Sequence, residues 1–359
     1  MKTVSPITEF EESLGKLIAS GGWNVETPLP TTRRLAEEHR LSNASVHRVL
    51  RKLTDRGLLW RHDSGRYYSA RAQPILDKPK PLVCLLRQLQ IWSAAYRGIM
   101  AGVSAACGRS GRSMILTHND FLVRHPDTAH PPVMGNAADQ VAALAQFFDI
   151  HPEPLHGFVL DHLWKDEVLA RFRKRLRNVV VTDRRSTLDF VSGVFPDERH
   201  GAMLALGHLA ARGYRRLFAV RPFQGDEPTE RFLEAIFAAA RQIGFPLSPD
   251  DLRIASTPEE RAALVAEVAA VPERVALFCP EENIGLILLA ALREGGIDVP
   301  GRVGLLISGE ARNTAARGVS SLLVPFERIG QEAVAILDRN SETPRHVCLP
   351  VELFHGATT

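Results

Sequence analysis

The chain has 359 residues, which is more than one ordinary domain contains and favours two or three. Its hydrophobic share of 45% and charged share of 24% are typical of a globular protein, and no segment supplies the ~20 unbroken apolar residues of a membrane span. The first residues include acids and lack the apolar run of a signal peptide. We therefore exclude intrinsic disorder and membrane insertion, and we expect a cytoplasmic protein.

Charge is divided unevenly along the chain. The first 80 residues contain 14 Lys and Arg against 9 Asp and Glu, whereas the remainder contains 30 against 32. Most of the surplus lies in a basic segment in which only Asp55 and Asp63 are acidic. Its basic residues are Arg40, Arg48, Arg51, Lys52, Arg56, Arg61, Arg66 and Arg71. Such a segment can be a solvated face, so an interpretation as a nucleic-acid surface needs a supporting local pattern.

The first seventy residues supply that pattern, because they predict three helices and a hairpin. An opening helix ends near the glycine pair at 21–22, and its apolar positions are Ile7, Phe10, Leu14 and Leu17. Thr31 or Thr32 can cap a second helix. Ser42 caps a third helix, whose apolar stripe is Val46, Val49, Leu50 and Leu53. Residues 58–61 and 66–69 read as two strands joined by a turn, which completes a winged helix-turn-helix.

The run LPTTRRLAEEHRLSNASVHRVLRKLTDRGLL, with the glycine-containing wing after it, resembles the DNA-binding domain of GntR-type bacterial transcription regulators. The resemblance implies a third helix in the major groove and a wing near the minor groove, with Arg33 and the start of that helix on phosphates. The family usually has arginine where this chain has Asn43 and His47, which leaves the base preference open. Trp60 and the wing tyrosines are expected to pack. The candidate DNA-binding residues are Arg33, Ser42, Asn43, Ser45, His47, Arg48, Arg51, Gly65 and Arg66.

A proline-rich linker at 71–81 separates this domain, 1–70, from the remainder, 82–359. From residue 82 onward, short apolar runs alternate with amphipathic helical stretches; the runs are VCLL, SMILT, GFVL, NVVVT, RLFAV, VALF and VGLLIS. Strands that are apolar along their whole length and separated by single helices indicate parallel sheets covered on both faces. The predicted fold class is α/β, with two such sheets and a cleft between them.

Four further segments resemble the effector-binding half of LacI-type repressors, which share the periplasmic sugar-binding fold: HGAMLALGHLAARGYRRLFAV, TERFLEAIFAAARQIGFPL, LLAALREGGIDVPGRVGLLIS and SLLVPFERIGQEAVAIL. A GntR-type domain on a LacI-type body is similar to the arabinose-repressor type of regulator. The resemblance implies two lobes joined by three crossovers, a homodimer formed through the body and a small effector in the cleft. Two heads on a symmetric body require two related half-sites, so we expect the double-stranded DNA operator to be an inverted repeat. The predicted function is that of a transcription regulator, expected to be a repressor controlled by a polar metabolite such as a sugar.

The resemblance also suggests effector contacts. Arg231 stands where the family has an arginine that holds the ligand, and Asp183 ends the strand NVVVT, where α/β clefts bind ligands. Trp92 follows the first strand and can stack on a ring. The family's Asn-Asp pair is Glu281-Glu282 here, and Gly309, between Ser308 and Glu310, replaces its later aspartate. The added acids favour a neutral or cationic polyhydroxylated effector over a sugar phosphate. The candidate effector residues are Trp92, Asp183, Arg231, Glu281, Glu282, Ser308 and Glu310.

Cysteine and histidine spacing indicates neither a disulfide framework nor a metal site. The cysteines are scattered, without a CxxC pair, and are expected to be buried reduced thiols: Cys84, Cys107, Cys279 and Cys348. A histidine cluster lacks the i, i+4 pairs with an acidic partner that metal sites favour, so these residues read as loop histidines: His118, His125, His130, His151, His156 and His162.

Two alternative functions stay open. GntR-type domains are sometimes fused to bodies that hold pyridoxal phosphate on a lysine, but beyond residue 80 only Lys165 and Lys174 occur, both in a charged helical stretch. No nucleophile elbow, P-loop or GxGxxG follows a strand, so we expect no enzyme and no cofactor. In the other alternative, the body has lost its effector and serves only to dimerise the DNA-binding domain.

Overall fold

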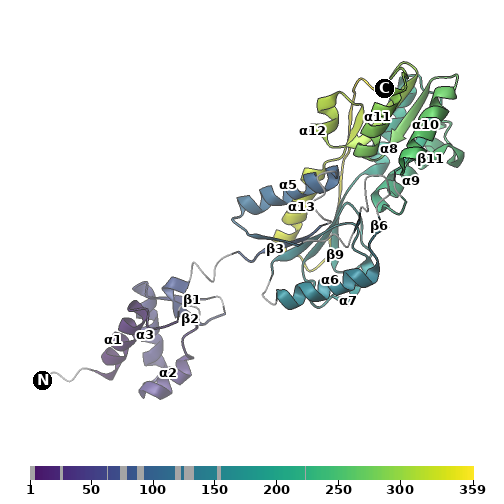
Figure 1. Ribbon diagram of the computed structural model, residues 1–359. Helices are drawn as coiled ribbons and strands as arrows, with labels where there is room; N and C mark the ends of the chain where they lie inside the picture. Colours follow the sequence, from purple (N-terminus) through teal and green to yellow (C-terminus); the bar gives the residue numbers. More distant parts are fainter. Residues whose placement is uncertain are drawn as a thin grey trace. The chain divides into compact units, whose positions relative to one another are not determined.

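The computed structural model describes residues 5–24, 27–62, 64–72, 79–86, 93–117, 123–124, 133–151, 155–222 and 224–359. It divides into two compact units, the head (Met1–Pro79) and the body (Lys80–Thr359), and Figure 1 shows the elements of each. Of the linker expected at 71–81, residues 73–78 lie outside the described residues.

Among its described residues, the head contains three α-helices, α1 (Pro6–Ala19), α2 (Thr32–His39) and α3 (Asn43–Asp55). Thr31 caps α2 by accepting a hydrogen bond from the Arg34 N–H, and Ser42 caps α3 by accepting one from the Ser45 N–H. The α3 stripe is buried as predicted. In α1 one prediction is wrong, because Leu17 is 40% exposed and Ile18 packs into the head core instead. Adjacent residues of a helix point in different directions, so only one of Leu17 and Ile18 faces the core. That residue is Ile18.

A two-stranded antiparallel wing follows α3. Its strands are β1 (Leu59–Arg61) and β2 (Tyr67–Ser69), and a 3-10 turn, η1 (Ala70–Ala72), closes the head. Gly65 has a φ of +80° in the turn, a conformation that glycine adopts without steric cost. Tyr67 packs against the head core, whereas Tyr68 contacts Trp60 on the other face of the hairpin. This alternation explains why adjacent tyrosines have different surroundings.

The body is built on two six-stranded sheets, one in each lobe. The first lobe has the all-parallel order β15-β9-β8-β7-β3-β4, formed by His346–Leu349, Val191–Pro196, Val179–Thr182, Gly157–Leu160, Leu82–Leu85 and Met114–Leu116. The second lobe has the order β11-β10-β12-β13-β14-β16, formed by Leu252–Ile254, Leu217–Arg221, Val275–Cys279, Val303–Gly309, Ser321–Leu323 and Glu352–Phe354. Only the pairing of β16 with β14 is antiparallel within these two sheets. A separate antiparallel pair joins β5 (Val123–Arg124) and β6 (Val133–Met134).

Helices cover both faces of each sheet. In the first lobe these are α5 (Ala94–Arg109) and α13 (Phe326–Arg339) on one face, with α6 (Ala137–Ile150) and α7 (Asp166–Arg171) on the other. In the second lobe α8 (Glu198–Ala211) and α9 (Glu227–Ile243) cover one face, and α10 (Pro258–Ala270) and α11 (Glu282–Glu294) cover the other. The remaining short turns are η2 (Pro249–Asp251), α12 (Ala311–Thr314) and η3 (Ala315–Arg317).

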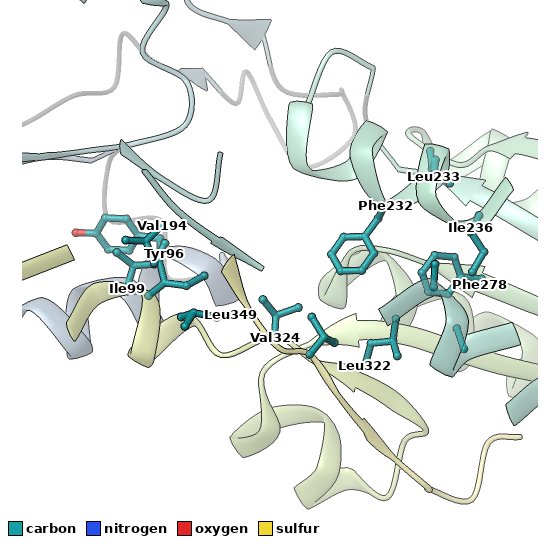
Figure 2. Close-up of a cluster of buried hydrophobic side chains, with 14 of the residues drawn as sticks. Tyr96, Ile99, Val194, Phe232, Leu233, Ile236, Phe278, Leu322, Val324 and Leu349 are labelled. Atoms are coloured by element: carbon teal, nitrogen blue, oxygen red, sulfur yellow. The ribbon is translucent and has the colours of Figure 1, made fainter. Parts of the chain in front are cut away.

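The chain passes between the lobes three times, as the resemblance implies. It crosses from β9 to α8, from β14 to α13 and from β15 to β16. One apolar cluster continues across these crossovers (Figure 2), where Val324 lies between a first-lobe group that includes Ile99 and a second-lobe group that includes Phe232. The lobes are therefore joined by packed side chains as well as by the backbone.

Helices α5 and α13 lie side by side at very close range. A Cβ at Gly102 would collide with the main-chain oxygen of Glu327, and one at Gly330 would collide with that of Ile99. Glycine is required at both positions because each backbone lies directly against the other.

The prediction of four buried cysteines is wrong at one position. Cys84, Cys107 and Cys279 are buried, but Cys348 is exposed. Cys348 lies on β15, the edge strand of the first sheet, whose outer residues contact solvent. All four are free thiols.

Candidate DNA-binding surface and effector site

The outer face of α3 presents a row of polar and basic side chains. Asn43, His47, Arg48 and Arg51 are exposed, because the buried stripe occupies the opposite side of the helix. Arg48 and Arg51 form no hydrogen bond or ion pair with any residue that the structure describes. Their guanidinium groups are thus available to phosphates or to guanine edges.

A groove of about 610 Å³ runs between this face and the wing. Its lining combines four basic or imidazole side chains with a hydroxyl and a phenol: His47, Arg48, Arg51, Thr54, Arg61 and Tyr67. Arg61, which the sequence analysis did not single out as a DNA contact, stands over the Tyr67 ring at 5.8 Å. The head therefore offers positive charge from the helix and from the wing to one bound polymer.

The other basic residues of α3 have a different role. Lys52 lies 3.0 Å from Glu11 of α1, and Arg56 lies 3.5 Å from the same carboxylate. These two cations help to hold α1 on α3. Lys52 and Arg56 of the basic segment thus pair with Glu11 within the head, whereas Arg48, Arg51 and Arg61 line the groove.

The remaining candidate DNA contacts lie around this surface. Arg33 is 85% exposed on α2 and pairs with Glu37 at 3.1 Å. The Ser42 hydroxyl contacts that of Ser45 at 2.9 Å at the start of α3, and Gly65 and Arg66 are exposed at the wing turn.

In the body, polar residues gather where the carboxyl ends of both parallel sheets face each other, which is where α/β folds bind ligands. Asp183 directly follows β8, with a φ of +60° and only 5% exposure. Burial raises the pKa of its carboxyl to about 6; His162 and Arg231 act against this shift, while Asp226 and Glu198 add to it. These four groups come from both lobes, so the Asp183 carboxyl faces the lobe interface.

Arg231 of α9 is occupied within the protein. Its guanidinium pairs with Glu198 and with Glu227, each at 2.8 Å, and donates to the main-chain oxygen of Asp183 at 2.6 Å. The last bond joins the second lobe to the first. Arg231 is therefore a link between the lobes in this structure, and each of its three guanidinium nitrogens already donates to an acceptor.

Two further links were not singled out from the sequence. His162, just after β7, contacts Asp161 at 3.2 Å and Asp226 of the second lobe at 3.1 Å. Arg97 of α5 contacts Glu282 at 3.2 Å, again between lobes. The strand-end position of His162 is a signal that could have found it, whereas nothing local to Arg97 marks a partner 185 residues away.

The second-lobe residues that differ from the LacI-type pattern, Glu281, Glu282 and Gly309, lie close together. Glu281 caps α11, and its side chain accepts from the Ile284 N–H at 2.7 Å. The Glu282 side chain accepts from the Glu310 N–H at 2.7 Å, and it occupies the space into which a side chain at Gly309 would project. The Glu282 side chain thus has room in this position because Gly309 has no side chain. Ser308 is buried in β13 beside them.

The remaining predictions concern a ring contact and metals. Trp92, His118, His125 and His130 lie outside the described residues. Within the described part of the chain, no group of three or more His, Cys, Asp or Glu side chains is arranged to hold a metal ion.

Known families match both units. Residues 6–68 match the bacterial regulatory proteins of the gntR family, and residues 206–359 match the periplasmic binding protein-like domain. Similar solved structures include a LacI family transcriptional regulator from Enterococcus faecium with bound ribose, at 18% identity and a TM-score of 0.62 over 78% of this chain and 98% of that one.

Two further structures have the same fold. The transcriptional regulator CelR in complex with cellobiose is 18% identical, with a TM-score of 0.63 over 92% of this chain and 100% of that one. The Escherichia coli transcriptional repressor ascG is 14% identical, with a TM-score of 0.61 over 78% and 99%.

The head and the body together define a DNA-binding transcription regulator. More particularly, the chain joins a GntR-type winged helix-turn-helix to a periplasmic-binding-protein-like body with the fold of LacI-family regulators. Among the described helices, none has both the length and the apolar character of a membrane span.

Proposed function

We propose that this regulator is a cytoplasmic repressor whose affinity for its operator is set by a small polar metabolite bound between the two lobes. The observation that carries the proposal is the set of contacts made between lobes at the carboxyl ends of the sheets, above all Arg231 to Asp183. A ligand entering there changes contacts on both lobes at once, so it binds one lobe arrangement more tightly than another. Similar structures hold ribose and cellobiose, which makes sugars the first class to test.

The operator is proposed to be an inverted repeat. A symmetric dimer formed through the body carries two heads, and two identical heads require two related half-sites. In each half-site the groove between α3 and the wing supplies Arg48, Arg51 and Arg61 to the DNA.

A catalytic role is not part of this proposal. Lys165 and Lys174 are both exposed, and Lys165 serves as the N-cap residue of α7. A lysine that forms a Schiff base is usually desolvated or beside another cation, which lowers its pKa. Both lysines are exposed to solvent rather than desolvated, which supports regulation rather than pyridoxal phosphate chemistry.

Genomic fragments captured by the full-length protein test the proposal directly. Fragments are eluted with salt, sequenced and footprinted with DNase, and the expected footprint is an inverted repeat protected on one face of the helix. A panel of neutral sugars, amino sugars and sugar phosphates is then added to the complex. Release by one panel member supports the whole proposal, whereas specific binding that no member changes supports an effector-independent DNA-binding protein. Capture without any sequence preference contradicts the proposed regulator.

A further inference from the structure

The lobe interface contains more carboxylates than cations among the residues that the structure describes. Its basic and imidazole groups are Arg97, Arg231 and His162. Its acids are Asp161, Asp183, Glu198, Asp226, Glu227, Glu281, Glu282 and Glu310. Among these residues the acids outnumber the basic and imidazole groups by eight to three.

Arg231 and Arg97 already form ion pairs with particular acids. Arg231 pairs with Glu198 and Glu227, and Arg97 lies 3.2 Å from Glu282 and 3.7 Å from Glu310. His162 lies between Asp161 and Asp226. Neither Asp183 nor Glu281 forms an ion pair with a described residue. The charges of His162 and Arg231 act to lower the pKa of Asp183 without forming such a pair, and Glu281 accepts from the neutral donors of Ile284 and Asn283.

Asp183 is the more unusual of the two. Its main chain is fully engaged, since its N–H donates to the Val194 oxygen at 2.8 Å and its own oxygen accepts from Arg231. Asp183 is only 5% exposed, yet no described residue donates a hydrogen bond to its carboxylate. A carboxylate that is largely removed from water reduces stability unless it is hydrogen-bonded, so a bound donor would stabilise it. The left-handed backbone of Asp183 is a second sign of local strain at a binding position.

We propose that the effector carries an ammonium group and is an amino sugar or a similar hydroxylated amine, with the ammonium bound to the Asp183 carboxylate at the lobe interface. This inference rests on the proposed function and specifies its ligand class. An ammonium has three donors and no acceptor, which suits acids that have no cation of their own. A neutral hydroxyl leaves the charge in place, and a phosphate is repelled by it.

The electrostatics of the site support this assignment. Burial raises the pKa of Asp183 to about 6 and that of Glu281 to about 7, and Asp226 adds to both shifts. Asp226 thus acts on Asp183 across the lobe interface and on Glu281 within the second lobe. A cation bound among them removes the repulsion that opposes close approach of the lobes, and this gives the ligand a preference for one lobe arrangement.

Matched sugars separate the ammonium from the rest of the ligand. Glucosamine, galactosamine and mannosamine are each compared with the parent hexose and with the N-acetyl derivative, by thermal shift and calorimetry on the full-length protein at pH 7. We expect at least one amino sugar to raise Tm saturably, and its parent and N-acetyl forms to bind at least tenfold more weakly. A tighter neutral sugar or sugar phosphate overturns the inference, as does the absence of binding by all three amino sugars.

A variant pair identifies the carboxylate. Asp183→Asn keeps the shape of the side chain and is expected to weaken amino-sugar binding at least tenfold, with operator binding retained. Asp189→Asn, on an exposed acid that pairs with Arg173 in the same lobe, is the matched control and is expected to change nothing. Equal binding by the Asp183→Asn variant overturns the inference. Operator binding by the same samples tests the proposed function. A failure of the ligand assignment can therefore be distinguished from a failure of the proposed regulator.

Discussion

Asp183 is a residue whose ionisation is expected to reduce the stability of the body. Its carboxyl is buried, lacks a donor among the described residues and carries a pKa raised to about 6. Because the folded protein holds this proton more tightly than the unfolded chain, the stabilising contribution is fully present below about pH 4 and is lost as pH rises through about 6. Above that range the ionised group destabilises the body.

Replacing Asp183 with Asn should therefore stabilise the protein in a pH-dependent way. The gain in free energy of unfolding should be about 1 to 2 kcal/mol larger at pH 8 than at pH 5, because only the wild type ionises there. Calorimetric unfolding of both proteins at the two pH values measures the difference. An equal effect of the substitution at both pH values would mean that the carboxyl titrates normally.

Helix α3 separates its basic residues into two groups by function. Arg48 and Arg51 line the groove, whereas Lys52 is tied to Glu11. The double variant Arg48→Ala/Arg51→Ala should lose at least tenfold in operator affinity, with a shallower salt dependence if the contacts are to phosphates. Lys52→Ala is the control and should lose less than about threefold. Fluorescence anisotropy at two salt concentrations measures both, and an unchanged affinity of the double variant contradicts this assignment of the groove.

The contact between α5 and α13 depends on glycine. Gly102→Val should destabilise the body by about 2 to 4 kcal/mol, because a side chain there meets the main chain of Glu327. Gly207→Ala, on the exposed face of α8 with open space around it, should instead stabilise by about 0.5 to 1 kcal/mol. Urea unfolding checks both values. A tolerated Gly102→Val would show that the two helices can move apart without loss.

Local patterns predicted the elements that carry strong periodicity, such as α3 and the apolar strands β7, β8 and β13. They did not predict β9 or β15, since a glycine and a proline interrupt the apolar run at 191–196 and an exposed edge strand has little apolar signal. The pairing of β15 with β9 joins residues about 150 positions apart, which no local pattern encodes.

The candidate effector site also combines features that a local sequence pattern predicts with features that depend on tertiary packing. The strand-end rule placed Asp183 at the lobe interface, because position along a parallel strand is a local property. The occupation of Arg231 by Glu198 and Glu227, and the contact of Arg97 with Glu282, depend on tertiary packing. Sequence alone therefore indicated that Asp183 lies at the end of a strand facing the other lobe, but not which charges at the lobe interface are compensated.

At the scale of the whole molecule, the account predicts a dimer. Sedimentation of the full-length protein at micromolar concentration should give about twice the chain mass of 39.6 kDa. Its operator should contain two half-sites in inverted orientation. A monomer that binds a single half-site with full affinity would contradict this assembly.

The most direct test of the central claim is the reciprocity between DNA and effector. The operator dissociation constant is measured by anisotropy with and without a saturating amino sugar, and the affinity for that sugar is measured by calorimetry with and without a saturating operator. If a ligand between the lobes controls the head, each must change the affinity for the other by the same factor, which we expect to be about 10 to 100. A ligand that binds with equal affinity to the free protein and to its DNA complex would contradict the account.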